Sequence, residues 1–273
     1  MKLQLFAIAA LLLFVPSAVL AQGIDATKLE QVLNRPGQKT GEVVRFGFSR
    51  TDLHVTVDGV TIRPGLALGS WAAFSGTEDN ASVMGDLVLL EGEVNPVIAK
   101  LRGPGFEITA IHNHLMNETP SLRYMHYMGS GNAEQLANSL RAALAESKTP
   151  LGKPASPAAS PSTPPAFVKT IEDTLGTKGK WSGGVLAFGI PRADTITEGG
   201  MTLSPPQGIA ESINFQSAGQ DRVATTGDFV LTAQEVNPVI SALEEHRIQV
   251  TAASQPYADG ATPSLLHAFL GCW

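Results

Sequence analysis

The chain has 273 residues, and its 19 Lys and Arg residues against 25 Asp and Glu residues give a formal net charge of −6. Nucleic-acid binding requires a concentrated basic surface, so this acidic balance argues against a nucleic-acid partner. A hydrophobic fraction of 43% beside 16% charged residues is too apolar for a disordered chain. The single cysteine, Cys272, excludes a disulfide framework and a cysteine zinc site, so any metal must be bound by histidine and carboxylate.

The first 21 residues have the pattern of a secretory signal peptide. Lys2 precedes an apolar run from Leu3 to Val15, and small residues stand before a cleavage boundary near Ala21. The run is too short to span a bilayer, and no later stretch approaches the roughly 18 apolar residues of a transmembrane helix. The sequence therefore predicts a secreted, most simply periplasmic, protein whose mature form has no transmembrane segment.

An internal repeat organises the rest of the chain. VVRFGFSRTD at 43–52 matches VLAFGIPRAD at 185–194, and GDLVLLEGEVNPVI at 85–98 matches GDFVLTAQEVNPVI at 227–240. Both pairs are offset by 142 residues, which indicates a duplicated domain with few net insertions. The predicted parts are a signal peptide at 1–21, a first repeat domain at 22–147, a Pro-, Ala- and Ser-rich linker at 148–166 and a second repeat domain at 167–273.

One charged motif belongs to the repeated unit. Arg50 and Asp52, two residues apart in the first copy, recur as Arg192 and Asp194 in the second. Because a functional site need not be present twice, whereas a structural contact of the fold is, we expect a structural ion pair in each copy.

The predicted elements of the first copy indicate an α+β fold. Alternating β-branched residues indicate strands, and capping and turn residues indicate where helices begin and where the chain turns. In chain order, they predict strands over 43–48 and 53–62 with an Asp58-Gly59 turn signal, then a covering loop over 64–84 and a short strand over 86–90. A helix is predicted from Glu93 to Gly103, with Pro96 in its first turn, followed by strands over 106–112 and 122–128. The last predicted element is a helix after Asn132, with Leu136, Leu140 and Leu144 on its apolar face. We therefore expect two tandem homologous α+β domains, each with a mainly antiparallel or mixed sheet and one or two helices.

A histidine cluster is the strongest candidate site. His112 and His114 are two residues apart, so on a strand both project from the same face. His126 lies on the next predicted strand, which can return antiparallel and bring a third imidazole beside them. Glu118 follows the first pair after a turn and offers a carboxylate as a fourth ligand. Three histidines and a carboxylate suit a borderline divalent ion, most simply zinc.

Other roles for the same residues stay open at this point. The histidines could form a polar or catalytic site without a metal, or be structural. Glu118 could instead act as the general base beside a three-histidine metal. Arg123, close to His126, is a candidate for binding an anionic substrate group or an ordinary surface arginine.

A second spacing resembles a known enzyme family. His54 and Asp58 form a His-x3-Asp pattern, which with His112-Asn113-His114 resembles the ligand spacing of the lysostaphin-like zinc peptidases that cut peptidoglycan. The surrounding glycine pattern of that family is missing. The resemblance implies a zinc peptidase as a weaker alternative.

The repeated strings themselves resemble the LppY/LpqO family of exported bacterial proteins, a domain of unknown function (DUF1259) that often occurs as two copies. The residues that carry the resemblance are VRFGFSRTDLHVTVDGVTIRPGLALGSWAAF, MGDLVLLEGEVNPVI and TAIHNHLMNETP with RYMHYMGSG in the first copy, and PRADTITEGGMTL and TGDFVLTAQEVNPVI in the second. The resemblance implies a secreted two-domain protein with His-rich strand ends. It implies no reaction.

The second copy departs from this family near its end. Family members carry His-x-His-Met-Leu and later Phe-Met-His-Phe-Trp there, whereas this chain has VTAASQPYADGATPSLLHAFLGCW. Codons allowed for Gln255 to Trp273 can encode the missing motif one nucleotide later, which suggests a shifted reading frame after about residue 252. If the sequence is genuine, we expect the second domain to lack a strand and its closing helix, and His267 not to be a metal ligand.

Together these observations predict an exported protein that binds a divalent metal through His112, His114, Glu118 and His126. A metal-dependent hydrolase acting on a small molecule or a cell-envelope component is one function, with Glu118 and Arg123 as its catalytic residues. A non-catalytic periplasmic ligand-binding protein is the alternative. A third is an interaction module that contacts its partner through residues 64–84.

Overall fold

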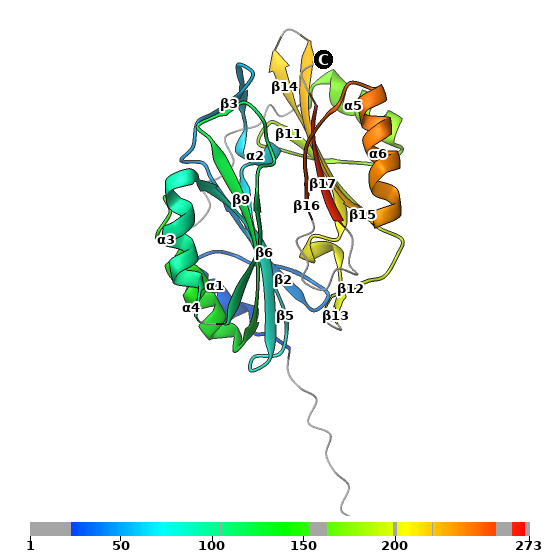
Figure 1. Cartoon of the computed structure of the whole chain (residues 1–273). Helices are drawn as coiled ribbons and strands as arrows, with labels where there is room; N and C mark the ends of the chain where they lie inside the picture. Colours follow the sequence, from blue (N-terminus) through cyan, green and yellow to red (C-terminus); the bar gives the residue numbers. More distant parts are fainter. Residues whose placement is uncertain are drawn as a thin grey trace, which may run out of the picture.

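The computed structural model of the chain describes residues 23–103, 105–152, 163–198, 201–219, 221–254 and 264–270 (Figure 1). The predicted signal peptide, most of the predicted linker and Cys272 lie outside these ranges. No helix within them is long and apolar enough to cross a membrane.

Each copy is built on a six-stranded antiparallel sheet, and the two sheets have the same strand order. The strands of the first sheet, in spatial order, are β1 (Gln38–Thr40), β2 (Val43–Ser49), β5 (Gly69–Gly76), β6 (Ala81–Leu90), β9 (Leu122–Gly131) and β7 (Phe106–His112). The strands of the second, in the equivalent order, are β10 (Lys180–Ser182), β11 (Val185–Pro191), β14 (Ala210–Gly219), β15 (Arg222–Leu231), β17 (Ser264–Leu270) and β16 (Gln249–Ser254). The repeat in the sequence is therefore a repeat of the fold, and the predicted α+β class is confirmed.

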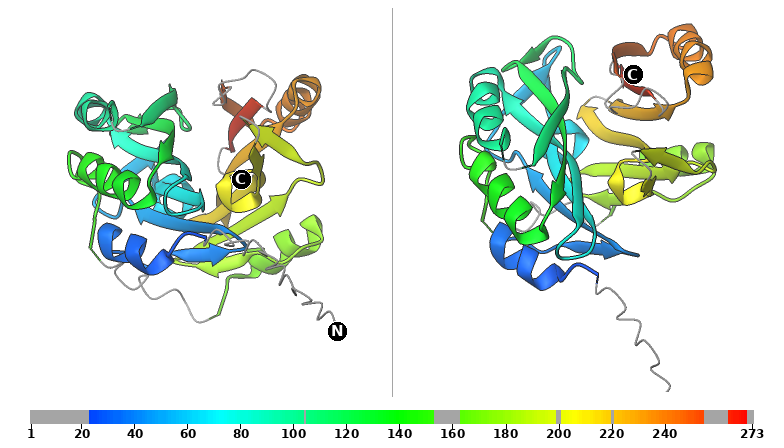
Figure 2. Two further views of the ribbon diagram at one scale, coloured as in Figure 1. Left: turned by 90° about the horizontal axis from the view of Figure 1, so that it is seen from below. Right: turned by 60° about the horizontal axis from the view of Figure 1, so that its bottom comes forward.

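Helices cover one face of each sheet. In the first copy these helices are α1 (Ala26–Leu33), α3 (Glu91–Leu101) and α4 (Ala133–Leu144), whose leucines form one core with the apolar side chains of β2, β5 and β6. Leu136, Leu140 and Leu144 are buried as predicted, and the Asn132 side chain accepts a hydrogen bond from the Gln135 N–H. In the second copy, α5 (Ala166–Leu175) and α6 (Ala233–Glu245) lie on the outer side of the sheet (Figure 2). Figure 2 shows the two sheets facing each other with the helices outside.

Smaller elements join the strands, and two predictions here were wrong in their boundaries. Residues 53–62 form a hairpin, β3 (Val55–Val57) and β4 (Val60–Ile62), because Asp58 and Gly59 both adopt positive φ angles and turn the chain. Strand β8 (Glu118–Thr119) pairs with β3, and β12 (Ile196–Glu198) pairs with β13 (Met201–Leu203). The helix predicted from Glu93 begins at Glu91, so Pro96 lies inside it and not in its first turn.

The prediction of a covering loop over residues 64–84 was also wrong. These residues form the short helix α2 (Pro64–Ala67), strand β5 and the first part of β6. Their small side chains are needed because both faces of β5 are covered: Ala72 packs in the helix-side core, and Ala73 on the other face is also fully buried. The Gly-, Ser- and Ala-rich composition of residues 64–84 suggested a loop, but a strand packed on both faces also requires small side chains.

The repeated arginine ties a strand end to a helix in each copy, which confirms the predicted structural ion pair. The Arg50 guanidinium is fully buried and lies 2.9 Å from Asp52 and 2.8 Å from Glu93 in the first turn of α3. Arg192 makes the equivalent contacts, 2.7 Å to Asp194 and 3.0 Å to Glu235 of α6.

The second face of the first sheet packs against the second copy. The Leu66 carbonyl accepts hydrogen bonds from the Asn214 amide and the Thr226 hydroxyl, and Trp71 and Met84 pack with apolar residues of the second copy. Part of the 64–84 segment that was expected to contact another protein thus contacts the second copy of the same chain.

The end of the second copy differs from its expectation. Strand β17 pairs with β15 and β16 as β9 pairs with β6 and β7, so the expected loss of a strand was wrong. Among the described residues, the second copy has no counterpart of α4. Most of the residues after 254 lie outside the described ranges, and a shifted reading frame stays a prediction.

Candidate metal centre

Three neighbouring strands of the first sheet deliver the candidate site. In the antiparallel register Asp86 of β6 lies opposite His126 of β9, and His112 at the end of β7 lies opposite Tyr124 of β9. Cross-strand partners share a face, so these side chains all lie on the face turned toward the second copy. His114 follows two residues after the end of β7. The prediction that β9 returns antiparallel and brings His126 to the first two histidines is confirmed.

The three imidazoles form a compact group. The Nε2 atoms of His112 and His114 are 3.0 Å apart, and each of the three histidines offers a nitrogen within 4.8 Å of the others. The ring centroid of His112 lies 4.9 Å from the ring centroid of His114 and 4.9 Å from that of His126. The His114 and His126 side chains are only 10% and 12% exposed. These positions allow all three residues to reach a common ion.

The donor set and its spacing fit a divalent metal. Two imidazole nitrogens bound tetrahedrally to zinc at about 2.0–2.1 Å would lie roughly 3.3 Å from each other. The observed 3.0 Å between the His112 and His114 nitrogens is close to that value. Imidazole is a ligand that zinc, copper, iron and nickel all accept.

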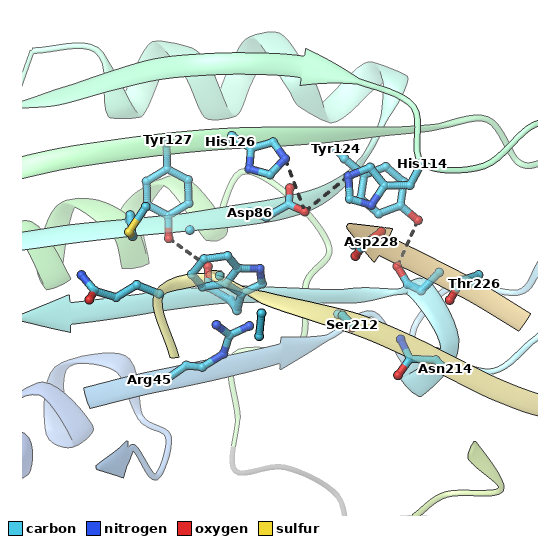
Figure 3. A pocket seen from close by; sticks show the side chains of 18 of the residues that line it. Arg45, Asp86, His114, Tyr124, His126, Tyr127, Ser212, Asn214, Thr226 and Asp228 are labelled. Atoms are coloured by element: carbon cyan, nitrogen blue, oxygen red, sulfur yellow. Dashed lines mark hydrogen bonds and ion pairs between the residues drawn. The ribbon is translucent and has the colours of Figure 1, made fainter. Parts of the chain in front are cut away.

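Asp86, which the sequence analysis did not select, is the carboxylate beside the histidines (Figure 3). Its Oδ2 atom lies 3.7 Å from His114 Nε2 and 4.0 Å from His126 Nε2, and the residue is 5% exposed. A signal for it was present, because the buried strand sequence Gly85-Asp86 recurs as Gly227-Asp228 in the second copy. An acidic residue inside an apolar strand is costly unless it has a function or a partner.

Tyr124 and the second copy fix the position of His114. The Tyr124 ring stacks on the His114 imidazole with a centroid distance of 3.7 Å and an angle of 8°, and its hydroxyl donates to the Ala67 carbonyl. Burial, then the negative charges of Asp86, Asp228 and Glu118, raise the pKa of the Tyr124 hydroxyl well above its usual value. The Thr251 hydroxyl donates to the His114 carbonyl at 2.6 Å. The ligand-bearing loop is therefore held from both copies.

Two members of the metal-capable group, His114 and His126, line a cavity of about 240 Å³ between the two copies. The first copy contributes Asp86, His114, His126 and Tyr124, together with Arg45 and Trp71. The second contributes polar side chains, namely Gln207, Ser212, Asn214, Thr226 and Asp228. The cavity is smaller than the roughly 300–1,000 Å³ typical of sites for drug-sized ligands, so its size fits a small molecule.

Arg45 is the second residue that the sequence analysis missed. Val44 and Phe46 of β2 face the helices, so Arg45 between them faces the cavity. Its guanidinium lies 3.9 Å from the centre of the Trp71 ring and donates to the Pro206 carbonyl. Burial lowers the pKa of Arg45 to about 10, and electrostatic interactions with the Tyr127 hydroxyl and the Asp86 carboxylate partly oppose this shift. The signal available in the sequence was one cation within an otherwise apolar strand.

Two residues predicted for the site lie elsewhere. Glu118 is not part of the metal-capable group, and its carboxylate accepts a hydrogen bond from the Leu122 N–H. Arg123 does not line the cavity, since it alternates with Tyr124 along β9. It donates to Asn113, Ser121 and Leu122 and forms a 3.7 Å ion pair with Glu91.

The alternative ligands His54 and Asp58 are also separate from the cluster. Both are exposed, and neither belongs to the group of metal-capable residues that the described part of the chain contains. Asp58 accepts a hydrogen bond from the Asn117 side chain.

The second copy repeats the strand pairing of the site but not the complete set of histidines. Asp228 lies opposite His267 just as Asp86 lies opposite His126. Ala110 of β7 pairs with His126, and Ala252 of β16 pairs with His267 in the same way. Ser254, two residues after Ala252, therefore takes the position of His112, two residues after Ala110. Within the described residues, the three-histidine group exists in the first copy alone.

Comparison with known proteins agrees with the repeated fold. The family model for a Domain of Unknown Function (DUF1259) matches residues 27–146 and 169–266, which confirms the resemblance seen in the repeated strings. Neither a curated protein nor a solved structure shows a significant match to the chain. Because the two matched segments cover well over half of the 273 residues, the chain belongs to the DUF1259 family and carries two tandem copies of its domain.

Proposed function

We propose that this protein binds one divalent metal ion, zinc most simply, through His112, His114 and His126. The observation that carries the proposal is the convergence of three imidazole nitrogens within 4.8 Å of one another, with His114 and His126 lining a cavity. Three protein ligands leave a coordination position of a tetrahedral ion for a ligand from the cavity, as in catalytic zinc sites.

The reaction that best suits this arrangement is hydrolysis of a small molecule. A divalent ion at this place would supply Lewis-acid activation of a ligand oxygen. Asp86 Oδ2, 3.7 Å from His114 Nε2, is placed to accept a proton from a hydroxyl group or water in the cavity. Asp86 and Arg45 thus take the roles that the sequence suggested for Glu118 and Arg123. The polar side chains of the second copy would orient the substrate.

Export to the periplasm is part of the same proposal. Its support is the charged, apolar and small-residue pattern of residues 1–21. Mass spectrometry of the protein from the periplasmic fraction should find a mature chain that begins near Gln22. A full-length chain in the cytoplasmic fraction would contradict export.

Metal content is the direct test of the binding proposal. Elemental mass spectrometry of protein purified without a histidine tag should find close to one divalent ion per chain. The double variant His112→Ala/His114→Ala should lose it, whereas His54→Ala, an exposed histidine outside the cluster, should keep it. A wild-type chain that folds and stays empty after incubation with zinc, copper, nickel and iron would contradict the proposal.

Asp86→Asn separates a hydrolase from a non-catalytic binding protein. If Asp86 moves a proton, the variant keeps its metal and loses turnover of model esters and phosphoesters that the wild type hydrolyses. If Asp86 is a fourth ligand that closes the coordination shell, the variant loses metal affinity, and the wild type has no hydrolase activity to lose. The second result would contradict hydrolysis and favour the binding protein.

A further inference from the structure

Arg45 is a cation within the cavity that has no carboxylate partner in the described part of the chain. No Asp or Glu oxygen there lies within ion-pair distance of its guanidinium, although twelve ion pairs involving other residues are present. One terminal nitrogen donates to the Pro206 carbonyl. An arginine has five N–H donors, so most of them remain available to a ligand.

The surroundings of Arg45 make it a rigid binding group. Its guanidinium stacks on Trp71, and burial lowers its pKa to about 10, so it stays charged at neutral pH. A largely desolvated cation without an anion is unfavourable, and an oxyanion that enters the cavity relieves that cost. A planar guanidinium suits a carboxylate or a phosphate because it can donate two parallel hydrogen bonds.

Arg45 lies at one place along the cavity, and His114 and His126 of the histidine cluster lie at another (Figure 3). Arg45 is on β2 and Asp86 on β6, with β5 between them, so these two strands lie roughly 10 Å apart. A small ligand can therefore contact Arg45 with one end and the cluster with the other. Trp71, which lies opposite Asp86 in the β5–β6 register, provides an apolar surface between the two ends.

We infer that the cavity selects small oxyanions, carboxylate or phosphate, by binding the anionic group on Arg45 while a second polar group of the same molecule faces the histidine cluster. This inference rests on the proposed metal site for the role of the second group. Asp86 and Asp228 also line the cavity, and a divalent ion would offset their two negative charges. Anion binding should therefore be stronger in the metal-loaded protein than in the metal-free protein.

Calorimetric titration tests the inference with two anions and a neutral analogue. Succinate represents a carboxylate ligand, inorganic phosphate a phosphate ligand, and succinamide lacks the charge. The proteins are the wild type, Arg45→Gln, Arg45→Lys and Arg102→Gln, with metal content and thermal unfolding measured for each. Arg102 is an exposed arginine at the end of α3 and is the matched control.

We expect at least one of the two anions, and not succinamide, to bind the metal-loaded wild type. Arg45→Gln should weaken that binding tenfold or more with metal content unchanged, because a charge-assisted pair is lost. The anion affinity of Arg45→Lys should lie between those of the wild type and Arg45→Gln, and the anion affinity of Arg102→Gln should match that of the wild type. The stronger of the two anions identifies the ligand class.

Two failures can be told apart. A folded, metal-loaded wild type that binds neither anion, or an Arg45→Gln variant that binds as well as the wild type, would overturn this inference and leave the metal site intact. A wild type without metal would overturn the proposed function, and Arg45-dependent anion binding in that protein would support the anion site alone. If Arg45→Gln does not fold, the Arg45→Lys variant decides, since equal affinity there would overturn the bidentate contact.

Discussion

Asp86 of β6 lies directly opposite His126 of β9, with Asp86 Oδ2 4.0 Å from His126 Nε2. The second copy has the same register between Asp228 and His267. The duplication has therefore preserved the strands that position the site in both copies. Ser254, in place of His112, removes a ligand from the second copy.

This difference predicts a stoichiometry of one metal ion per chain in a protein with two copies of the domain. His267→Ala should leave the metal content unchanged, whereas His126→Ala should abolish it or lower the affinity strongly. Elemental analysis after dialysis against a weak chelator measures both. Two ions per chain in the wild type, with one lost in His267→Ala, would show that the second copy also binds metal.

Gly85, next to Asp86, is required for packing. A Cβ atom at this position would overlap the Trp71 carbonyl oxygen and the Tyr127 hydroxyl, which themselves share a hydrogen bond of 3.2 Å. We expect Gly85→Ala to lower the free energy of unfolding by about 1–3 kcal/mol or more, measured by urea denaturation. Gly47→Ala is the control, because a Cβ atom there meets nothing within 4 Å. Equal stabilities of the two variants would contradict the close packing at Gly85.

The buried ion pair of Arg50 should be essential to the first copy. Arg50→Met removes the guanidinium and leaves Glu93, 8% exposed, without its cationic partner. Breaking a buried pair in this way costs about 3–5 kcal/mol, which urea denaturation would detect as a lower midpoint. Arg102→Met, at an exposed position, should change stability by less than about 0.5 kcal/mol. A small effect of Arg50→Met would show that the network contributes little.

The ion pair between Arg192 and Glu235 in the second copy predicts that the stability of the protein depends on pH in the acidic range. The hydrogen bond from Arg192, then that from the Thr232 N–H, lowers the pKa of Glu235 from 4.5 to about 2. A depressed folded-state pKa gives stability that is present above pH 4.5 and is lost as the pH falls toward 2. Because the Glu235 side chain is 41% exposed, solvent and salt reduce the effect.

Thermal unfolding of wild type and Glu235→Gln at pH 7 and near pH 2 measures this contribution. The wild type should have the higher melting temperature at pH 7, and the difference should shrink in acid, where Glu235 takes up a proton. A difference of the same size at both pH values would contradict the assigned pKa shift.

The repeated strings and the histidine spacing allowed the main features to be predicted. The 142-residue offset indicated two copies of one fold, and the alternation of strands placed His112 and His126 on a shared face. These predictions depended on local periodicity and on the neighbouring position of consecutive strands, both of which a sequence records.

Asp86 and Arg45 could not be assigned in the same way because their role depends on contacts between distant strands. Asp86 meets the histidines through the pairing of β6 with β9, and Arg45 reaches the cavity only because the second copy closes it. Glu118 was chosen for its nearness in sequence, but its carboxylate instead accepts a hydrogen bond from Leu122 at the start of β9. Residues that are close in sequence to the histidines therefore need not be close to them in the fold, because a turn separates Glu118 from the pair.

The most direct test of the metal centre is anomalous diffraction from crystals of zinc-loaded protein. We expect one strong peak at the zinc edge, about 2.0–2.1 Å from a ring nitrogen of each of His112, His114 and His126. A peak bound instead by His54 and Asp58, or crystals of zinc-treated protein with no peak at the three histidines, would contradict this expectation.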